Sequence, residues 1–295
     1  MRQQCNLNSD MKKICFNFFV VLVLWTPFLT HSECIGDIVA KKSYSVYVVP
    51  QTAISQLYSY WVPLLESLGK RSNQCFELIV PATIPIFEKQ LLNGKADFAF
   101  VNPYHAVMAF KAHQYVPLIA DGKNKLDGLI VVRADSKINE LKDLNHSKIA
   151  FPAPNAFAAS LLIRSFLMQK GIKFEPIYVK SHKNVYWSVM TGDVPAGGGV
   201  NNTFFREPDE IKNQLRILYK TPMFMPHPFI ANPRVPPSVQ QAVQNAFLSM
   251  KNDPALTEIL NNVQIPDPIA VDYRKDYMPI DKLILEKFAV SSENQ

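Results

Sequence analysis

This 295-residue chain has only four cysteines, and its basic residues are scattered along the sequence. These two features argue against zinc-binding, redox and nucleic-acid-binding proteins. Of the four cysteines, only Cys34 and Cys75 lie beyond the first 32 residues, and their spacing matches no zinc or redox motif. The six histidines show no metal-ligand spacing either, so we expect no metal and no other cofactor. No arginine-rich stripe alternates with aromatic residues, so nucleic acid is not an expected partner.

The sequence also lacks the short motifs of common hydrolytic and phosphate-transfer chemistry. Ser160 falls within a predicted helix and is not part of a Gly-x-Ser-x-Gly turn, and there is no His-Glu-x-x-His. The glycine run at residues 197–199 is not followed by the Gly-Lys-Ser/Thr of a phosphate-binding loop. We therefore expect a protein that is not an enzyme.

The apolar run near the N-terminus is shorter than the roughly 20 residues that a membrane-spanning helix needs. Lys12 and Lys13 precede the run, residues 14–29, and small residues follow it. This pattern predicts a secretory signal in residues 1–32, with Met11 as an alternative start and the periplasm as the destination. An uncleaved membrane anchor is the alternative.

Two further features bear on the partners of the chain. In an oxidising periplasm Cys34 and Cys75 can form a disulfide, although two free thiols fit the sequence as well. The net charge of the whole chain, +6, is only mildly basic and favours anions in general.

Strand-like and helix-like segments alternate along the chain, and the same order occurs twice. In the first half, the expected strands are 44–49, 76–80 and 97–101, and the expected helices are 54–68, ending at Gly69, and 83–92. In the second half, the expected strands are 148–151, 175–179 and the glycine-rich run, and the expected helices are 155–170 and 185–191. We predict a two-lobe α/β fold in which each lobe is a mainly parallel sheet flanked by helices, with a ligand cleft between the lobes.

Two connections between the lobes are expected to act as hinges. They are the polar turn with the strand that follows it, residues 121–128, and the proline-rich stretch, residues 219–228. One lobe would then comprise residues 35–120 and 229–295, and the other residues 129–218. Closure of such lobes around a solute is a common ligand-driven motion.

The junction between a buried strand and an apolar helix at residues 96–110 has the pattern of a binding site. Asn102 suits the helix N-cap, and Pro103 suits the first turn, where it has no N–H to lose. The free backbone N–H groups of this turn, with their partial positive charge, favour a polar or anionic ligand. An ordinary strand-to-helix turn fits the same residues.

Several segments resemble one family of binding proteins. They are ADFAFVNPYHAV, residues 129–151 (LIVVRADSKINELKDLNHSKIAF), the helix that opens at Pro154-Asn155, His182 ahead of a helix, and TGDVPAG. Together they are similar to the phosphate, phosphite and phosphonate-binding (PhnD-like) periplasmic proteins of ABC importers, which have the type II two-lobe fold. The resemblance implies a small-molecule ligand, a permease in the inner membrane as partner, and ligand contacts from Tyr104 and His182.

One segment departs from that family. Where the family has a hydroxyl-rich Ser-Thr-Ser-Gly type of turn, this chain has Asn155-Ala156-Phe157-Ala158. Backbone N–H groups remain available there, and Phe157 would add an apolar wall. We therefore predict that the natural ligand is not a simple phosphonate held in the family's usual manner.

The candidate ligand contacts share a position near the end of a strand or the start of a helix. They are Gln51, Thr83, Asn102, Tyr104, Asn155, Ala156, Phe157, His182 and Asn201. Each has a structural alternative: Tyr104 as a packed ring, His182 and Asn155 as helix caps, and Asn201 as part of a turn. We expect a monomer, and a membrane sensor such as a histidine kinase or cyclase is the alternative partner to a permease.

Overall fold

The computed structural model describes residues 34–37, 39–40, 42–283 and 285–290. All of them belong to one of the two units into which contacts divide the chain, Ser32–Gln295. The predicted signal in residues 1–32 and the alternative start at Met11 lie outside the described residues. No described helix combines the length and the apolar character needed to cross a membrane.

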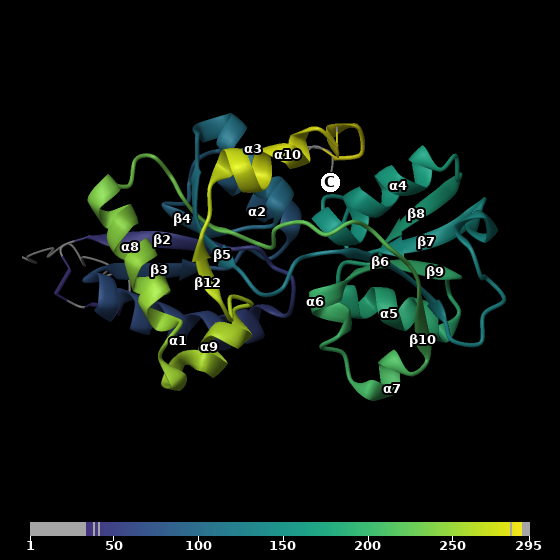
Figure 1. The fold of residues 1–295 in the computed structure, drawn as a ribbon, viewed down its shortest axis with the longest axis horizontal. Helices are drawn as coiled ribbons and strands as arrows, with labels where there is room; N and C mark the ends of the chain where they lie inside the picture. Colours follow the sequence, from purple (N-terminus) through teal and green to yellow (C-terminus); the bar gives the residue numbers. More distant parts are fainter. Residues whose placement is uncertain (1–33, 38, 41, 284, 291–295) are drawn as a thin grey trace, which may run out of the picture. The chain divides into compact units, whose positions relative to one another are not determined.

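The first sheet has seven strands in the order β1-β3-β2-β4-β11-β5-β12. Helices α1, α8 and α9 cover one face of this sheet, and α2, α3 and α10 cover the other (Figure 1). The strands are β1 (Ile35–Gly36), β2 (Ser43–Val48), β3 (Cys75–Ile79), β4 (Phe98–Phe100), β5 (Val116–Asp121), β11 (Phe229–Ala231) and β12 (Pro268–Ala270). The helices are α1 (Ile54–Ser72), α2 (Ile84–Leu92), α3 (Pro103–His113), α8 (Pro237–Met250), α9 (Thr257–Asn262) and α10 (Met278–Asp281).

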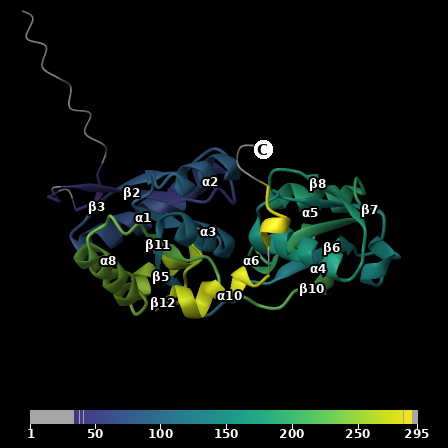
Figure 2. The same cartoon turned by 90° about the horizontal axis from the view of Figure 1, so that it is seen from above.

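The second sheet has five strands in the order β10-β6-β9-β7-β8. The view from above separates its elements from those of the first sheet (Figure 2). The strands are β6 (Gly128–Arg133), β7 (Ser147–Phe151), β8 (Phe174–Tyr178), β9 (Ala196–Val200) and β10 (Leu215–Lys220). The helices are a π-helical turn (Phe157–Leu162), α4 (Ile163–Gln169), α5 (His182–Thr191), α6 (Asn201–Phe204) and α7 (Asp209–Lys212).

The predicted two-lobe α/β fold is confirmed. The sheet of each lobe contains a core of three parallel strands, arranged in the same way in both lobes. β2 lies between β3 and β4 in parallel, and β7 lies between β8 and β9 in the same way. The prediction of mainly parallel sheets is wrong beyond these triplets, because all other strand pairs are antiparallel. β6 and β11 each follow a connection between the lobes. Both strands therefore point away from the crevice, and each is antiparallel to the core strand beside it.

Side chains that alternate along β6, in the second sheet, are buried on both of its faces. Leu129 and Val131 of β6 pack with Val185 of α5, whereas Ile130 and Val132 pack on the opposite face. This period of two over a continuous apolar run is typical of a strand that is covered on both sides.

The glycine run of β9 allows helical backbone to lie directly on the second sheet. A Cβ atom on Gly198 would lie 2.1 Å from the carbonyl oxygen of Ala159, and one on Gly128 of β6 would lie 2.3 Å from that of Ala158. Both alanines belong to the π-helical turn, with which the predicted helix 155–170 opens before it continues as α4. These glycines are therefore needed for packing.

Helix α1 does not stop at Gly69, as the sequence predicted, but continues to Ser72 and ends at Asn73, whose φ is 56°. Gly69 instead allows the backbone of α1 to lie close to that of Gly36, because a Cβ atom on Gly69 would lie 2.5 Å from the Cα atom of Gly36. Beside this contact, Cys34 and Cys75 form a disulfide that ties the segment before β1 to the start of β3. The pairing is the one that the sequence allowed.

Two segments connect the sheets, residues 122–127 between β5 and β6 and residues 221–228 between β10 and β11. They pair with each other through an antiparallel bridge between Leu126 and Phe224. The backbone N–H of each residue donates to the carbonyl of the other, at 2.9 and 2.8 Å. The two connections thus lie side by side.

Candidate ligand-binding cleft

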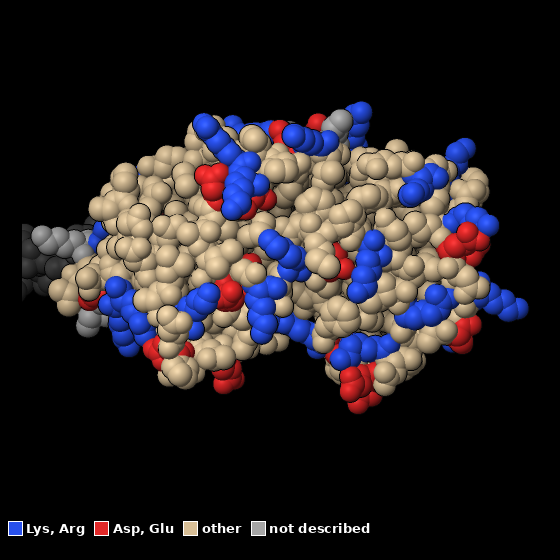
Figure 3. Space-filling view, viewed as in Figure 1, with Lys and Arg blue, Asp and Glu red and all other residues tan. Residues whose placement is uncertain are grey.

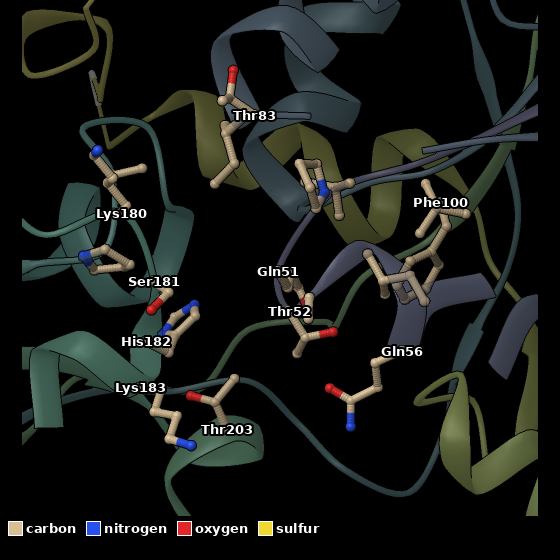
Figure 4. Close-up of a pocket in the computed structure, with 18 of the residues that line it drawn as sticks. Gln51, Thr52, Gln56, Thr83, Phe100, Lys180, Ser181, His182, Lys183 and Thr203 are labelled. Carbon is tan, nitrogen blue, oxygen red and sulfur yellow. The ribbon is translucent and has the colours of Figure 1, made fainter. Parts of the chain in front are cut away.

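A cavity of about 1770 Å³ lies at the carboxyl ends of the parallel strands of both sheets. The first lobe lines it with the segment after β2 and the start of α2, and the second lobe with the segments after β7 and β8. In Figure 4, Ser181, His182 and Lys183 lie on one side of the space, opposite Gln51 and Thr52. Crevices outside the carboxyl ends of parallel strands are the usual ligand sites of open α/β sheets.

Three of the predicted contact residues, Gln51, Thr83 and His182, line this cavity. The side chain of Gln51 contacts the ring of His227 and accepts a hydrogen bond from Nε2 of Gln264 at 3.3 Å. Thr83 is the N-cap of α2, where its Oγ1 accepts from the backbone N–H of Ile86 at 3.4 Å. Their predicted roles as ligand contacts stay predictions.

His182 is the first residue of α5 and faces the cavity as a neutral ring. The N-cap of this helix is Ser181, whose Oγ accepts from the backbone N–H of Asn184 at 3.1 Å, so the capping alternative for His182 is wrong. Burial lowers the pKa of His182 to about 4, and its Nδ1 has no hydrogen-bond partner among the described residues. The ring thus offers hydrogen bonding but no charge near neutral pH.

Positive charge prevails in the lining of the cavity. Four of its residues are cationic and one is acidic: Lys89, Lys180, Lys183 and Arg206, against Glu207. Within the described chain none of the four cations forms a salt bridge, although Lys183 opposes the rise that burial causes in the pKa of Glu207. Several Lys and Arg side chains border the indentation between the two halves of the molecule (Figure 3). This balance favours an anion.

Asn102 takes the predicted capping position but faces the protein interior. Its Oδ1 accepts from the backbone N–H of His105 at 2.8 Å, with Pro103 in the first turn of α3, so the predicted cap is confirmed. Asn102 is buried, and its Nδ2 donates to the carbonyl of Asn155 at 3.3 Å. It does not line the cavity.

Tyr104 lies in the main hydrophobic core, with 7% of its surface exposed, and not in the lining of the cavity. Burial raises the pKa of its phenol to about 12, and the nearby carboxylate of Glu286 adds to the rise. The geometry therefore fits the alternative of a packed ring and does not support the predicted ligand contact.

The predicted contacts at residues 155–157 are used within the protein. Nδ2 of Asn155 donates to Oε2 of Glu88 at 2.9 Å and to the carbonyl of Val290 at 2.8 Å. Its Oδ1 accepts from the backbone N–H of Val290 at 2.9 Å. Because both N–H groups of this amide are engaged, the side chain of Asn155 has no donor left for a solute.

Ala156 and Phe157 are buried and lie outside the lining of the cavity. The ring of Phe157, 2% exposed, meets that of Phe224 edge-to-face at 5.6 Å between centroids. The expectation that Phe157 forms an apolar wall of the pocket is therefore wrong. Its ring instead packs in the core against one of the connections between the lobes, which removes more apolar surface from water than a cavity wall would.

Asn201 lies at a second, smaller cavity of about 250 Å³. Its Nδ2 donates to the carbonyl of Lys125 at 2.7 Å, which ties the end of β9 to the first connection. Asn202, His227 and Gln264 share this cavity. No group of three or more potential metal ligands occurs in the part of the chain that the structure describes.

Sequence reasoning missed most of the polar residues that line the large cavity. They are Thr52, Gln56, Lys89, Lys180, Ser181, Lys183, Thr203, Arg206, Glu207, Asn261, Asn262 and Gln264. The strand-to-helix junction at Lys180-Ser181-His182-Lys183 carried the same kind of signal as the junction at Asn102. No local pattern marks Arg206 or Gln264, because tertiary packing alone brings them to the cavity.

Two lobes with the same parallel core, joined by two connections and bordering a cavity at the strand ends, define the class of two-lobe, type II periplasmic binding proteins. The chain belongs to a family described as "ABC transporter, phosphonate, periplasmic substrate-binding protein", which matches residues 46–277. The resemblance seen in the sequence is thereby confirmed.

Individual relatives are distant in sequence and close in fold. The phosphate-import protein PhnD of Mycolicibacterium smegmatis is 24% identical over 226 residues, which cover 69% of this chain and 70% of the relative. PhnD1 of Prochlorococcus marinus, solved in complex with methylphosphonate, aligns with a TM-score of 0.75 at 15% identity, covering 84% of this chain and 99% of that one. A binding protein component of an ABC phosphonate transporter from Pseudomonas aeruginosa gives 0.72 at 16% identity, covering 83% and 86%. At these identities the solved structures establish the fold alone.

Proposed function

We propose that this chain captures a small anionic solute in its cleft and delivers it to an ABC importer in the inner membrane. The observation that carries the proposal is the lining of the large cavity, where four cationic side chains accompany a single carboxylate. Membership of a family of periplasmic substrate-binding proteins supports the same role. The chain would act in the periplasm as a monomer without catalytic activity, after removal of residues 1–32.

The charged group of the solute would bind at the second-lobe side of the cavity. Lys180, Lys183 and Arg206 supply positive charge there, while Gln51, Thr83 and His182 supply neutral polar groups. A hydrogen bond to a charged group contributes about 1.5 to 3 kcal/mol, so three or four of them support micromolar binding after ordering costs are met.

Capture would involve movement of the lobes about residues 121–128 and 219–228. The lobes would be residues 35–120 with 229–295, and residues 129–218. The antiparallel bridge between Leu126 and Phe224 supports this view, because it makes the two connections move as one strip. Such a paired hinge permits closure and opposes independent twisting of the lobes.

A ligand screen tests the function. The purified protein is heated with phosphate, phosphonates, sulfonates, carboxylates and amino acids, and hits are measured by titration calorimetry. A ligand at 100 times its dissociation constant adds about 2.7 kcal/mol to stability, which a thermal shift detects readily. Saturable binding of an anion supports the proposal, whereas exclusive binding of cations or of neutral solutes contradicts it.

The same titrations test the narrower prediction about the ligand. Methylphosphonate, 2-aminoethylphosphonate, phosphite and phosphate are expected to bind weakly, because the donors of Asn155 already serve Glu88 and Val290. Submicromolar binding of any of the four would overturn this prediction and leave the wider proposal of an anion-binding protein intact.

A further inference from the structure

A buried carboxylate connects the two lobes beside the cleft. Glu88 lies on α2 with 1% of its surface exposed, and no Lys or Arg of the described residues forms a salt bridge with it. Burying a carboxylate is costly unless hydrogen bonds replace its lost water. The groups that replace water around Glu88 therefore form a site that is built for an anion.

Two side chains from separate segments take the place of water around the carboxylate of Glu88. Nε2 of His105, in the first turn of α3, lies 2.8 Å from Oε1 of Glu88, and Nδ2 of Asn155, after β7, donates to Oε2 at 2.9 Å. His105 is fully buried, and its ring packs against that of Phe87 with the centroids 5.4 Å apart. Each oxygen of the carboxylate thus has its own donor, and both donors are fixed.

The C-terminal segment closes this site on the side of the second lobe. The backbone of Val290 engages both polar atoms of the Asn155 amide. Nη2 of Arg164, itself buried, donates to the carbonyls of Phe288 and Pro154 at 2.7 and 2.6 Å. These bonds fix the orientation of the Asn155 amide, so that one of its N–H groups points at Glu88.

We propose that His105 and Asn155 form an anion site and that Glu88 fills it as a ligand supplied by the protein itself. The carboxylate joins α2 of the first lobe to the second lobe, as a bound anion would, without any solute. Resting on the proposed function, the inference also implies that the charged group of a captured solute binds elsewhere, at the edge formed by Lys180, Lys183 and Arg206.

Removal of the carboxylate tests the site directly. The substitution Glu88→Ala deletes four atoms that have the shape of acetate and leaves the donors of His105 and Asn155 in place. We expect a lower Tm for this variant and a saturable rise with added acetate, of about 5 °C once acetate exceeds its dissociation constant a hundredfold. Wild type and the matched variant Glu66→Ala, which removes an exposed carboxylate from α1, should not respond.

Acetamide serves as the control ligand, because it has the same shape as acetate without the charge. If Glu88→Ala is unfolded in buffer without acetate, its near-ultraviolet circular dichroism should return on titration with acetate. Failure of acetate to stabilise or refold the variant, or equal effects of acetamide, would refute the site. The assay needs no cleft ligand, so its outcome is independent of the screen that tests the proposed function.

The implied position of the solute has its own test. For an anion identified in the screen, Glu88→Ala saturated with acetate should keep wild-type affinity, because the solute does not use the donors of His105 and Asn155. A tenfold or larger loss of affinity in that variant would show that the solute competes with acetate for the donors of His105 and Asn155, and would overturn this part of the inference.

Discussion

The side-chain amide of Asn155 pairs with the backbone of Val290 as one strand residue pairs with another. Nδ2 donates to the carbonyl of Val290 at 2.8 Å, and Oδ1 accepts from its N–H at 2.9 Å. The two residues are 135 positions apart, and Val290 also lines the large cavity. One amide therefore holds the C-terminal segment at the edge of the cleft.

The first prediction is that Asn155→Ala destabilises the protein by about 3 kcal/mol or more. The substitution removes three hydrogen bonds, one of them to a carboxylate, and leaves Glu88 buried with a single donor. Urea unfolding measures the change. The matched variant Asn252→Ala, at an exposed position, should stay within about 0.5 kcal/mol of wild type, and a similarly small effect at Asn155 would contradict the network.

The second prediction concerns Tyr104, for which the family resemblance and the structure lead to different expectations. Resemblance predicts that Tyr104→Phe weakens ligand binding by about 1 kcal/mol or more. The structure buries the ring in the core, away from the lining of the cavity, so we expect unchanged affinity in titration calorimetry. A fivefold loss of affinity with an unchanged Tm would favour the contact role after all.

Much of the fold was predictable because its signals are local. The N-cap at Asn102 and the alternation of strands and helices both follow from neighbouring residues. The predicted helix end at Gly69 and the predicted parallel order of the first sheet, which β11 breaks, were wrong for a different reason. Gly69 meets Gly36 across the structure, and β11 enters its sheet from the second lobe, so neither feature is encoded within a window of sequence.

The candidate site was less predictable, for the same reason. Helix-terminal positions such as Thr83 and His182 were found because strand ends meet at the crevice of an α/β sheet. The hydrogen bond from Asn155 to Glu88, 67 residues away, depends on how the two lobes pack. No periodicity in the sequence reveals it. Phe157 illustrates the point: an aromatic ring after a strand suits a pocket wall and a core equally well.

The third prediction concerns the disulfide between Cys34 and Cys75. A cross-link over 41 residues restricts the unfolded chain, and the loop-entropy relation gives a stabilisation of about 3 to 4 kcal/mol. Thermal unfolding with and without a phosphine reductant should show a lower Tm on reduction. Cys34→Ser should lower the Tm to the same extent and lose all response to the reductant, and an equal response in both proteins would contradict the cross-link.

The fourth prediction concerns stability at acid pH. Burial lowers the pKa of His182 from 6.5 to about 4, so between these values the unfolded chain binds a proton that the folded protein does not. The free energy of unfolding therefore falls as the pH drops from 6.5 to 4, by up to about 3 kcal/mol from this residue.

The variant His182→Gln should lose this contribution and show a flatter pH profile in urea unfolding. His227 should keep part of the slope, because burial lowers its pKa to about 3. The control is His146→Asn at an exposed residue with φ of 60°, a conformation that Asn tolerates. Equal slopes for wild type and His182→Gln would show that His182 does not titrate as described.

The last prediction concerns Arg206, a cationic residue that lines both cavities. Its Nη2 donates to the carbonyl of Asn261 at 2.7 Å, and no acidic side chain of the described residues forms a salt bridge with the guanidinium. A cation so placed is available to an anion. Losing one charge-assisted hydrogen bond corresponds to an affinity loss of about tenfold to a hundredfold.

We therefore expect Arg206→Gln to weaken binding of the anion found in the screen by that factor, and to reduce the dependence of the affinity on salt, since one charge has been removed. Arg274→Gln, at an exposed position outside both cavities, controls for the change in net charge. Calorimetric titrations at low and at high salt measure both effects. Equal affinities for the two variants would mean that the solute's charge does not bind at Arg206, whereas a loss confined to Arg206→Gln would locate it at this edge of the cleft.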